Sequence, residues 1–202
     1  MKILYIDKNN PDKNILNNAK DALKAGKTVV YPTDTCLGIA ANVFREDAVE
    51  NVFLLKQRPR EKPMSVIFPS LGEAEKYVEI DDFSREIMNK RLPGPFTFVL
   101  RKKDSFPGFF SESEFLGIRI PNDEISLFLA KDFPITTTSA NVSGDKPSYS
   151  LSETKVKADI FLDAGTLKPN PPSTVIKIHN KKIEVLRGHD LFAEVLNSNH
   201  KS

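Results

Sequence analysis

The chain has 202 residues, of which 40% are hydrophobic and 28% are charged, and its formal net charge is +2 at pH 7. This length fits one domain with a core of its own, or one domain with a small appendage. The near balance of 29 basic and 27 acidic residues excludes a strongly basic chain, so any nucleic-acid surface must be local. One cysteine excludes an internal disulfide framework and a multi-cysteine zinc site.

The first residues, MKILYIDKNN, are too polar for a signal peptide. No apolar run approaches the roughly 18 residues that a membrane-spanning helix needs. We therefore expect a cytoplasmic protein with no membrane contact.

Strands and helices are predicted to alternate along the first half of the chain. A strand is predicted over 2–6, and a helix over 11–25, because Asp12 suits a helix start and Gly26 a helix stop. A buried strand over 28–32 and a helix over 46–57 follow. The remaining predicted elements are helices over 71–78 and 83–92, strands over 65–68, 96–100, 117–121, 135–139, 160–163, 174–178 and 182–186, and a short final helix with a polar tail over 190–202. This order indicates an α/β domain with a mixed sheet, because strict alternation fails toward the C-terminus.

Hydroxyl and carboxylate side chains follow the strand predicted over 28–32. Thr33, Asp34 and Thr35 come directly after Pro32. Ligands of α/β proteins often lie at strand ends, so these side chains could bind a small polar ligand. Asp and Thr also hydrogen-bond nearby backbone readily, so a capped turn explains them equally well.

A basic stretch, KQRPREKP, occupies residues 56–63. Pro59 disfavours helix at Arg58 and favours an extended backbone there. If the chain leaves the helix at this point, Lys56 and Arg58 converge on an anionic group, the first as a point charge and the second as a planar fork. The alternative is an ordinary solvated turn.

Polar residues also follow the strand predicted over 135–139. Ser139 ends this strand, and Asn141 lies two residues later, in TSANVSG. Their side chains suit the polar groups of a nucleotide, or they cap the next turn.

Three further polar residues lie in or beside predicted strands. Ser173 precedes the strand over 174–178, and Arg187 follows the strand over 182–186. Arg119 lies inside the apolar strand GIRIP and needs an anionic partner, which is either an incoming carboxylate or phosphate or a structural salt bridge.

Together these segments resemble one family. PTDT, KxRPxxKP, PGPFT, GIRIP, TSANVSG, STV and a late arginine motif occur in the order and spacing of the YrdC/Sua5 family of threonylcarbamoyl-AMP synthases. Lys56-x-Arg58 and Ser139-x-Asn141 look like the signature tetrad of that family. The resemblance implies a YrdC-like twisted mixed sheet flanked by helices, as a single domain of the short YrdC type over 10–190, followed by a C-terminal tail over 191–202.

The resemblance also implies a reaction. L-Threonine, bicarbonate or CO2, and ATP would give L-threonylcarbamoyladenylate and pyrophosphate, the first step of N6-threonylcarbamoyladenosine formation at A37 of tRNA. The threonine amine attacks CO2, and the carbamate oxygen then attacks the α-phosphorus. This nucleotidyl transfer needs positioning and charge neutralisation and no covalent enzyme nucleophile, in line with the absence of a Ser/His/Asp or Cys/His arrangement.

The residues that match the family motifs have implied roles. The implied catalytic residues are Lys56 and Arg58. The implied threonine contacts are Thr35, Arg119, Ser139 and Ser173. The implied ATP contacts are Arg58, Lys62, Asn141 and Arg187. Mg²⁺ would enter with the nucleotide and keep several waters, and no protein metal site is implied, since the three histidines lie apart in the sequence.

This chain departs from the family pattern in three places. Leu37 stands where PT[DE]TVYGL has a tyrosine, from which we expect a looser pocket wall. A proline-rich segment over 169–172 replaces a glycine-rich one, and the last motif reads RGH instead of R-x-G.

Two other functions remain as alternatives. One is a double-stranded RNA or tRNA-binding module, because the fold is associated with a basic concave face that LRKKD (100–104) and KQRPREK (56–62) would supply. The other is the carbamoyl-transfer domain of hydrogenase maturation proteins, which normally carry zinc-finger and acylphosphatase segments that this sequence lacks. If the synthase is right, downstream threonylcarbamoyl-transfer proteins are the expected partners.

Overall fold

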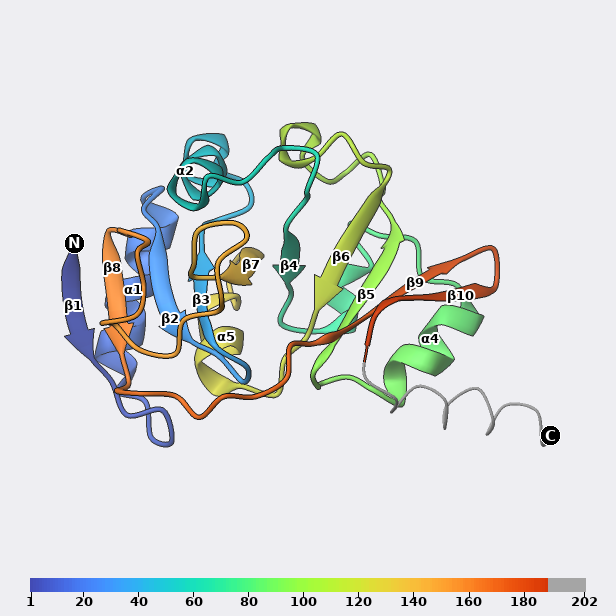
Figure 1. The fold of residues 1–202 in the computed structure, drawn as a ribbon. Helices are drawn as coiled ribbons and strands as arrows, with labels where there is room; N and C mark the ends of the chain where they lie inside the picture. The colour runs from blue at the N-terminus through green and yellow to red at the C-terminus, as the bar shows by residue number, and fades with distance from the viewer. Residues whose placement is uncertain (189–202) are drawn as a thin grey trace.

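Within residues 1–188, ten strands form one mixed sheet in the order β1-β8-β2-β3-β7-β4-β6-β5-β9-β10 (Figure 1). The structure is a computed structural model that describes residues 1–188. The strands are β1 (Lys2–Tyr5), β2 (Val29–Pro32), β3 (Leu37–Ala40), β4 (Ser65–Ile67), β5 (Phe96–Arg101), β6 (Phe115–Arg119), β7 (Ile135–Ser139), β8 (Ile160–Asp163), β9 (Thr174–His179) and β10 (Lys182–Arg187). The helices are α1 (Lys13–Lys24), α2 (Glu46–Lys56), α3 (Leu71–Ala74), α4 (Asp82–Asn89), α5 (Glu124–Leu129) and the 3-10 turn η1 (Gly108–Phe110).

Parallel and antiparallel strand pairs are interspersed across the sheet. The pairs β1–β8, β8–β2, β4–β6 and β5–β9 are parallel, whereas β2–β3, β3–β7, β7–β4, β6–β5 and β9–β10 are antiparallel. The predicted mixed α/β sheet is therefore confirmed. Segments far apart in the sequence become neighbours, which allows distant polar clusters to meet at one site.

The two faces of the sheet are covered differently. On one face, side chains from α2, α3 and α4 pack into a large apolar core that runs along much of the sheet. On the other face, α1 and α5 pack together over a smaller core behind β2 and β3 (Figure 1). Successive residues of a strand point to opposite faces, and this alternation decides which polar side chains face the site described below.

Helix ends follow from local sequence signals. The side chains of Asp12, Asp81 and Asp123 accept hydrogen bonds from backbone amides in the first turns of α1, α4 and α5. Helix α2 ends at Lys56 and is capped by Gln57, which has a left-handed backbone with φ 49°, and the amide of Arg58 donates to the carbonyl of Phe53 at 2.9 Å. The chain thus leaves the helix at the position that Pro59 predicts.

Several predicted elements differ from the structure. Strand β3 and helix α5 were not predicted, and the helix predicted over 71–78 ends at Ala74, after which Val78 forms a bridge with Lys102 of the neighbouring chain segment. Residues 2–5 precede the predicted domain start at residue 10, yet they pair with β8 as part of the sheet. The helix and tail predicted over 190–202 lie outside the described residues. Within the described part, no helix is long and apolar enough to cross a membrane.

Candidate active site

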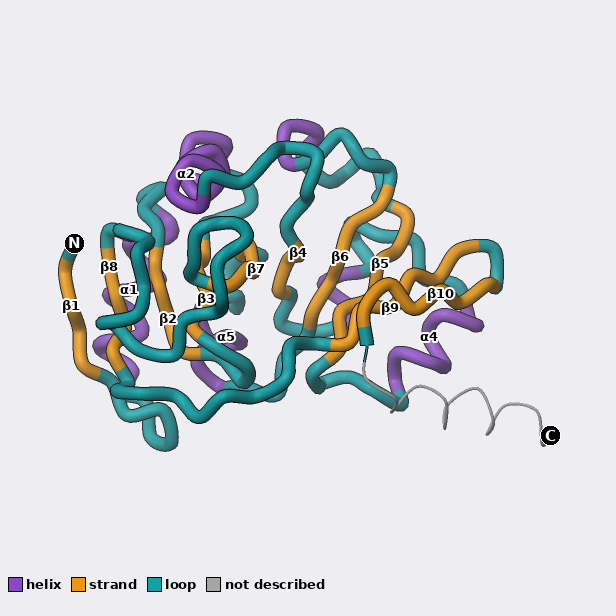
Figure 2. The backbone as a smooth tube through the Cα atoms, in the orientation of Figure 1, coloured by secondary structure: helices purple, strands orange, loops and turns teal. Residues whose placement is uncertain are grey.

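A cavity of about 340 Å³ opens on the sheet face that α1 and α5 leave partly uncovered. Strands β4, β5, β6 and β7 contribute polar side chains to it, β3 contributes Gly38, and the segment between β8 and β9 closes one side. Figure 2 shows that this last segment is loop throughout as it crosses the end of the sheet. Six residues predicted from separate motifs line the cavity: Thr35, Arg58, Arg119, Ser139, Ser173 and Arg187.

The turn between β2 and β3 is organised by the hydroxyl of Thr33. This hydroxyl donates to the carbonyl of Cys36 at 2.7 Å and accepts hydrogen bonds from the amides of Thr35 and Cys36 at 3.0 and 3.2 Å. The capped-turn interpretation therefore holds for Thr33. The turn places Thr35 and Cys36 at the cavity wall.

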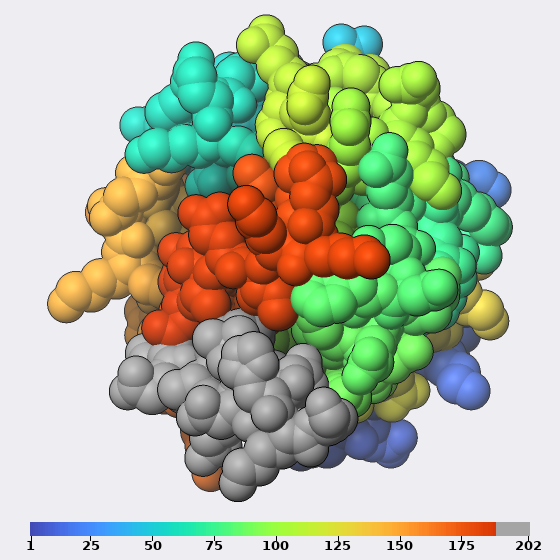
Figure 3. Space-filling model, turned by 90° about the vertical axis from the view of Figure 1, so that its right-hand side faces the viewer, coloured from blue at the N-terminus to red at the C-terminus, as the bar shows by residue number. Residues whose placement is uncertain are grey.

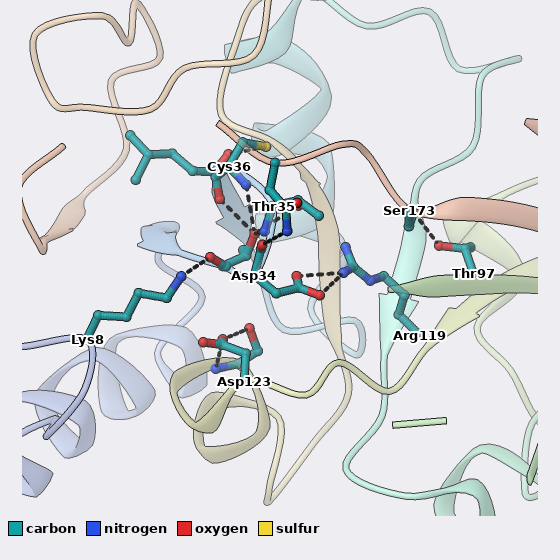
Figure 4. Close-up of polar contacts among 12 residues, drawn as sticks. Lys8, Asp34, Thr35, Cys36, Thr97, Arg119, Asp123 and Ser173 are labelled. Atoms are coloured by element: carbon teal, nitrogen blue, oxygen red, sulfur yellow. Dashed lines mark hydrogen bonds and ion pairs between the residues drawn. The ribbon is translucent and has the colours of Figure 1, made fainter. Parts of the chain in front are cut away.

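Arg119 of β6 forms an ion pair with Asp34. Its Nη2 donates to both carboxylate oxygens of Asp34, at 2.6 and 2.8 Å, and the side chains are 8% and 18% exposed. Figure 4 shows the guanidinium group pointing toward this carboxylate. The buried Nε of Arg119 has no hydrogen-bond partner within residues 1–188. The arginine thus has the structural salt bridge, and it also lines the cavity.

A second polar corner joins β5, β9 and the end of β10. The hydroxyls of Thr97 and Ser173 lie 3.0 Å apart, and Arg187 donates from Nη2 to the Ser173 hydroxyl and from Nε to the Ser173 carbonyl, both at 3.1 Å. Figure 4 shows the Thr97–Ser173 contact on the far side of Arg119 from Asp34. Figure 3 shows the hairpin of β9 and β10 (red) at the molecular surface, against the green segment that carries α4.

The basic stretch after α2 separates into residues with different surroundings. Arg58 lines the cavity and braces its own loop, donating from Nε to the carbonyl of Lys62 at 2.6 Å and from Nη2 to that of Pro63 at 3.1 Å. Arg60 turns away, with an ion pair to Glu50 and its guanidinium 4.5 Å from the ring of Phe53. The side chain of Lys62 is exposed and does not line the cavity.

Lys56 and Asn141 lie behind the cavity wall. Lys56 is 1% exposed and Asn141 is 7% exposed, and neither lines the cavity. The Asn141 side chain closes its own loop by donating to the carbonyls of Val142 and Asp145, at 2.8 and 2.9 Å. The structure thus places Lys56, Lys62 and Asn141 near the site but not on its surface.

The expectation for Leu37 is corrected. Leu37 is 1% exposed and its side chain packs in the core on the opposite face of the sheet. Its neighbour Gly38 faces the cavity, where an added Cβ would lie 2.9 Å from Thr33 and 3.2 Å from the ring of Tyr31. Replacing a tyrosine by Leu37 therefore does not loosen the cavity wall.

Further hydroxyl residues line the cavity without having been singled out from the sequence: Ser65, Thr97, Thr137 and Thr138. Ser65 and Thr137 are direct partners in the β4–β7 ladder, so their side chains share a face. The run ITTTS indicated that hydroxyl side chains would line the site, because alternate residues of a strand, such as Thr137 and Ser139, reach one side of the sheet.

Acidic and metal-binding groups are sparse at the site. Across residues 1–188, no cluster of three or more His, Cys, Asp or Glu side chains could hold a metal ion, and no carboxylate lines the cavity. Burial raises the pKa of the Cys36 thiol, which keeps it protonated at neutral pH. The chemistry of this donor set favours an anionic ligand over a resident metal ion.

The cations predicted for an RNA-binding face are largely engaged within the protein. The ammonium groups of Lys102 and Lys103 donate to the carbonyls of Ser111 and Glu75, at 2.7 and 2.6 Å. Arg101 lies 4.0 Å from a carboxylate oxygen of Glu79. These cations lie at the end of β5 and do not line the cavity.

Arginines and hydroxyls around one cavity, on a partly uncovered sheet face, define an α/β protein with a site suited to a small, polar, anionic ligand. More specifically, the chain belongs to the Sua5/YciO/YrdC family, since the model of that family (Sua5_yciO_yrdC, described as telomere recombination) matches residues 21–189. The predicted resemblance is confirmed.

Relatives in this family span most of the chain. A protein of Methanocaldococcus jannaschii, provisionally named threonylcarbamoyl-AMP synthase, is 38% identical over 179 residues, which cover 87% of this chain and 86% of that protein. Sua5 of Pyrococcus abyssi, solved in complex with L-threonine, has a TM-score of 0.88 and 27% identity over 98% of this chain. This chain covers 60% of that Sua5 chain. Escherichia coli YciO has a TM-score of 0.82 and 24% identity, over 93% of this chain and 95% of YciO, and this likeness confirms the fold.

Proposed function

We propose that this protein is a threonylcarbamoyl-AMP synthase. It would convert L-threonine, bicarbonate or CO2, and ATP into L-threonylcarbamoyladenylate and pyrophosphate, the first step of N6-threonylcarbamoyladenosine formation at A37 of tRNA. One observation carries the proposal: six residues from separate sequence motifs, which the family resemblance assigns to threonine and ATP, line one cavity.

Threonine is proposed to bind between Arg119 and the hydroxyl residues. Asp34 holds one nitrogen of Arg119, so the guanidinium has a fixed orientation at the cavity wall, where it would meet a substrate carboxylate. The hydroxyls of Thr35, Ser139 and Ser173 also line the cavity and offer donors and acceptors to the β-hydroxyl and amine of threonine.

ATP is proposed to place its phosphates near Arg58 and Arg187. Both guanidinium groups line the cavity, and both are braced by carbonyls of their own surroundings. Fixed cations that need not reorganise are suited to the charge that develops as the α-phosphorus is attacked. Lys62 and Asn141, also assigned to ATP, lie off the cavity surface, and their role remains a prediction.

Mg²⁺ is proposed to enter as part of the nucleotide substrate, with phosphate oxygens and waters as its ligands. The protein's own contribution is positioning. It would hold the threonine carbamate in line with the α-phosphorus and supply positive charge around the phosphates. The protonated Cys36 thiol fits this scheme, because no step requires an enzyme nucleophile.

Transfer of labelled carbon tests the proposal. With ATP and threonine present, carbon from labelled bicarbonate should appear in a product that also contains AMP. Omission of threonine should abolish this transfer. Failure of the label to enter any nucleotide product under these conditions would contradict the proposed function. The tRNA and the transfer proteins that would accept the product remain predicted partners.

A further inference from the structure

Lys56 is a buried cation whose surroundings do not resemble those of a side chain that binds phosphate. It is the last residue of α2, its side chain is 1% exposed, and it does not line the cavity. Arg58, two residues later, does line the cavity. The two cations of the Lys-x-Arg motif therefore lie on different sides of the cavity wall.

The ammonium group of Lys56 is bonded to backbone. It donates to the carbonyl of Ser139 and to the carbonyl of Asn141, the latter at 2.7 Å. The backbone of Lys56 makes a third connection, because its carbonyl accepts a hydrogen bond from the amide of Ser143 at 2.7 Å. These three bonds attach the end of α2 to residues 139–143, the turn that follows β7.

This turn carries a cavity-lining side chain. Ser139 is its first residue and lines the cavity, and the amide of Asn141 donates back to the Ser139 carbonyl at 2.9 Å. The same carbonyl therefore receives the Lys56 ammonium and the Asn141 amide. A shift of this backbone would change the position of the Ser139 hydroxyl relative to Arg58, which lines the same cavity.

We infer that Lys56 is a positioning residue that holds the 139–143 turn against the end of α2, and that it does not bind phosphate. It acts through the backbone of Ser139 and Asn141, while Arg58 makes the contact with the anionic ligand. The two cations of the motif thus have different roles, one on each side of the cavity wall.

The charge of Lys56 gives an independent line of support. Desolvation, together with the neighbouring charge of Arg58, lowers the pKa of Lys56 to about 8, while the interaction with the Cys36 side chain acts in the opposite direction. A neutral amine can still donate both hydrogen bonds. The positioning role therefore survives deprotonation, whereas attraction to a phosphate would not.

Hydrogen exchange tests the positioning role without any ligand. In Lys56→Met, the amides of Asn141 and Ser143 should exchange at least tenfold faster than in the wild type, because two bonds to the turn are lost. Lys103→Met is the matched control, since Lys103 also donates to a backbone carbonyl but lies away from this turn. Unchanged exchange of Asn141 and Ser143 in Lys56→Met would overturn the inference.

Nucleotide affinity separates positioning from phosphate binding, and this arm rests on the proposed function. The ratio of ATP to AMP affinity should stay within twofold of the wild-type ratio in Lys56→Met, and should fall at least tenfold in Arg58→Ala. A fall in Lys56→Met as large as in Arg58→Ala would overturn the inference. If the wild type binds neither nucleotide, the proposed function fails, and the exchange experiment still decides the role of Lys56.

A wild-type measurement covers the case in which Lys56→Met does not fold. The ATP-to-AMP affinity ratio should stay within twofold between pH 7.5 and 9.5. If the Lys56 ammonium bound phosphate, its pKa of about 8 would make it lose its positive charge over this range. A decline of tenfold or more in the ratio would therefore overturn the inference.

Discussion

Arg58 and Arg60 are two residues apart in the chain but have opposite surroundings. Arg58 lines the cavity, whereas Arg60 is paired with Glu50 and lies over the ring of Phe53. Loss of one preorganised donor to a transition state costs about 2–4 kcal/mol. We therefore expect Arg58→Ala to lower kcat by roughly 10²–10³ and Arg60→Ala to have a mild effect, measured as adenylate formation. Equal and small losses in the two variants would indicate that this stretch is an ordinary solvated turn.

The hydroxyl residues of the cavity predict amino-acid specificity. Serine keeps the hydroxyl of threonine and lacks one methyl group, a loss of roughly 1–3 kcal/mol. Valine keeps the size but leaves polar groups of the site unpaired, which sites built for a hydroxyl reject strongly. At matched concentrations, adenylate formation should be fastest with threonine, slower with serine and nearly absent with valine. Equal rates with valine and serine would show that the hydroxyl is not recognised.

The buried ammonium of Lys56 predicts how stability depends on pH. Its folded-state pKa of about 8 lies below its ordinary value of 10.5, so the unfolded chain binds more protons between these two values. The contribution of this group to the free energy of unfolding should therefore rise with pH from about 8 to 10.5. Urea denaturation should show a larger gain from pH 7.5 to 9.5 in the wild type than in Lys56→Met. An equal gain in both would contradict the lowered pKa.

At the scale of elements, most strands and helices follow from local patterns, and the exceptions have identifiable causes. Strand β3 is an apolar run of four residues directly after the turn at Thr33, and such a short run has no clear periodicity. Helix α5 spans only Glu124–Leu129, although Asp123 supplies a cap. Helix α3 stops early because the following chain pairs with the end of β5, a tertiary contact that no local pattern contains.

The end of β5 provides the test between enzyme and RNA-binding module. Because Arg101, Lys102 and Lys103 do not line the cavity, changing all three to Glu should leave adenylate formation nearly intact. The ammonium groups of Lys102 and Lys103 bond to backbone, so circular dichroism must confirm that the triple variant folds. Loss of adenylate formation in a folded triple variant would place these cations in the active site. If RNA binding is the main function, RNA affinity should fall steeply with salt and depend on these three residues.

At the scale of the whole molecule, the candidate site is a product of topology. Thr35, Arg58 and Ser139 come from three segments that the order of strands brings to one cavity. Local residue patterns could not decide whether each polar cluster is a capped turn or a ligand site. Only the family resemblance of all the motifs together predicted that the clusters meet at one site. The burial of Lys56 and the inward direction of Leu37 could not be predicted, because both depend on which sheet face a side chain reaches once the sheet is assembled.

Pyrophosphate release with radiolabelled ATP tests the central claim most directly. The wild-type protein is incubated with ATP, threonine and bicarbonate together, and then with each component omitted in turn. The account predicts that pyrophosphate and a labelled adenylate form only when threonine and bicarbonate are both present, because the attacking group is the carbamate that they make together. Pyrophosphate formed equally well without threonine would contradict the account and indicate a general nucleotide hydrolase.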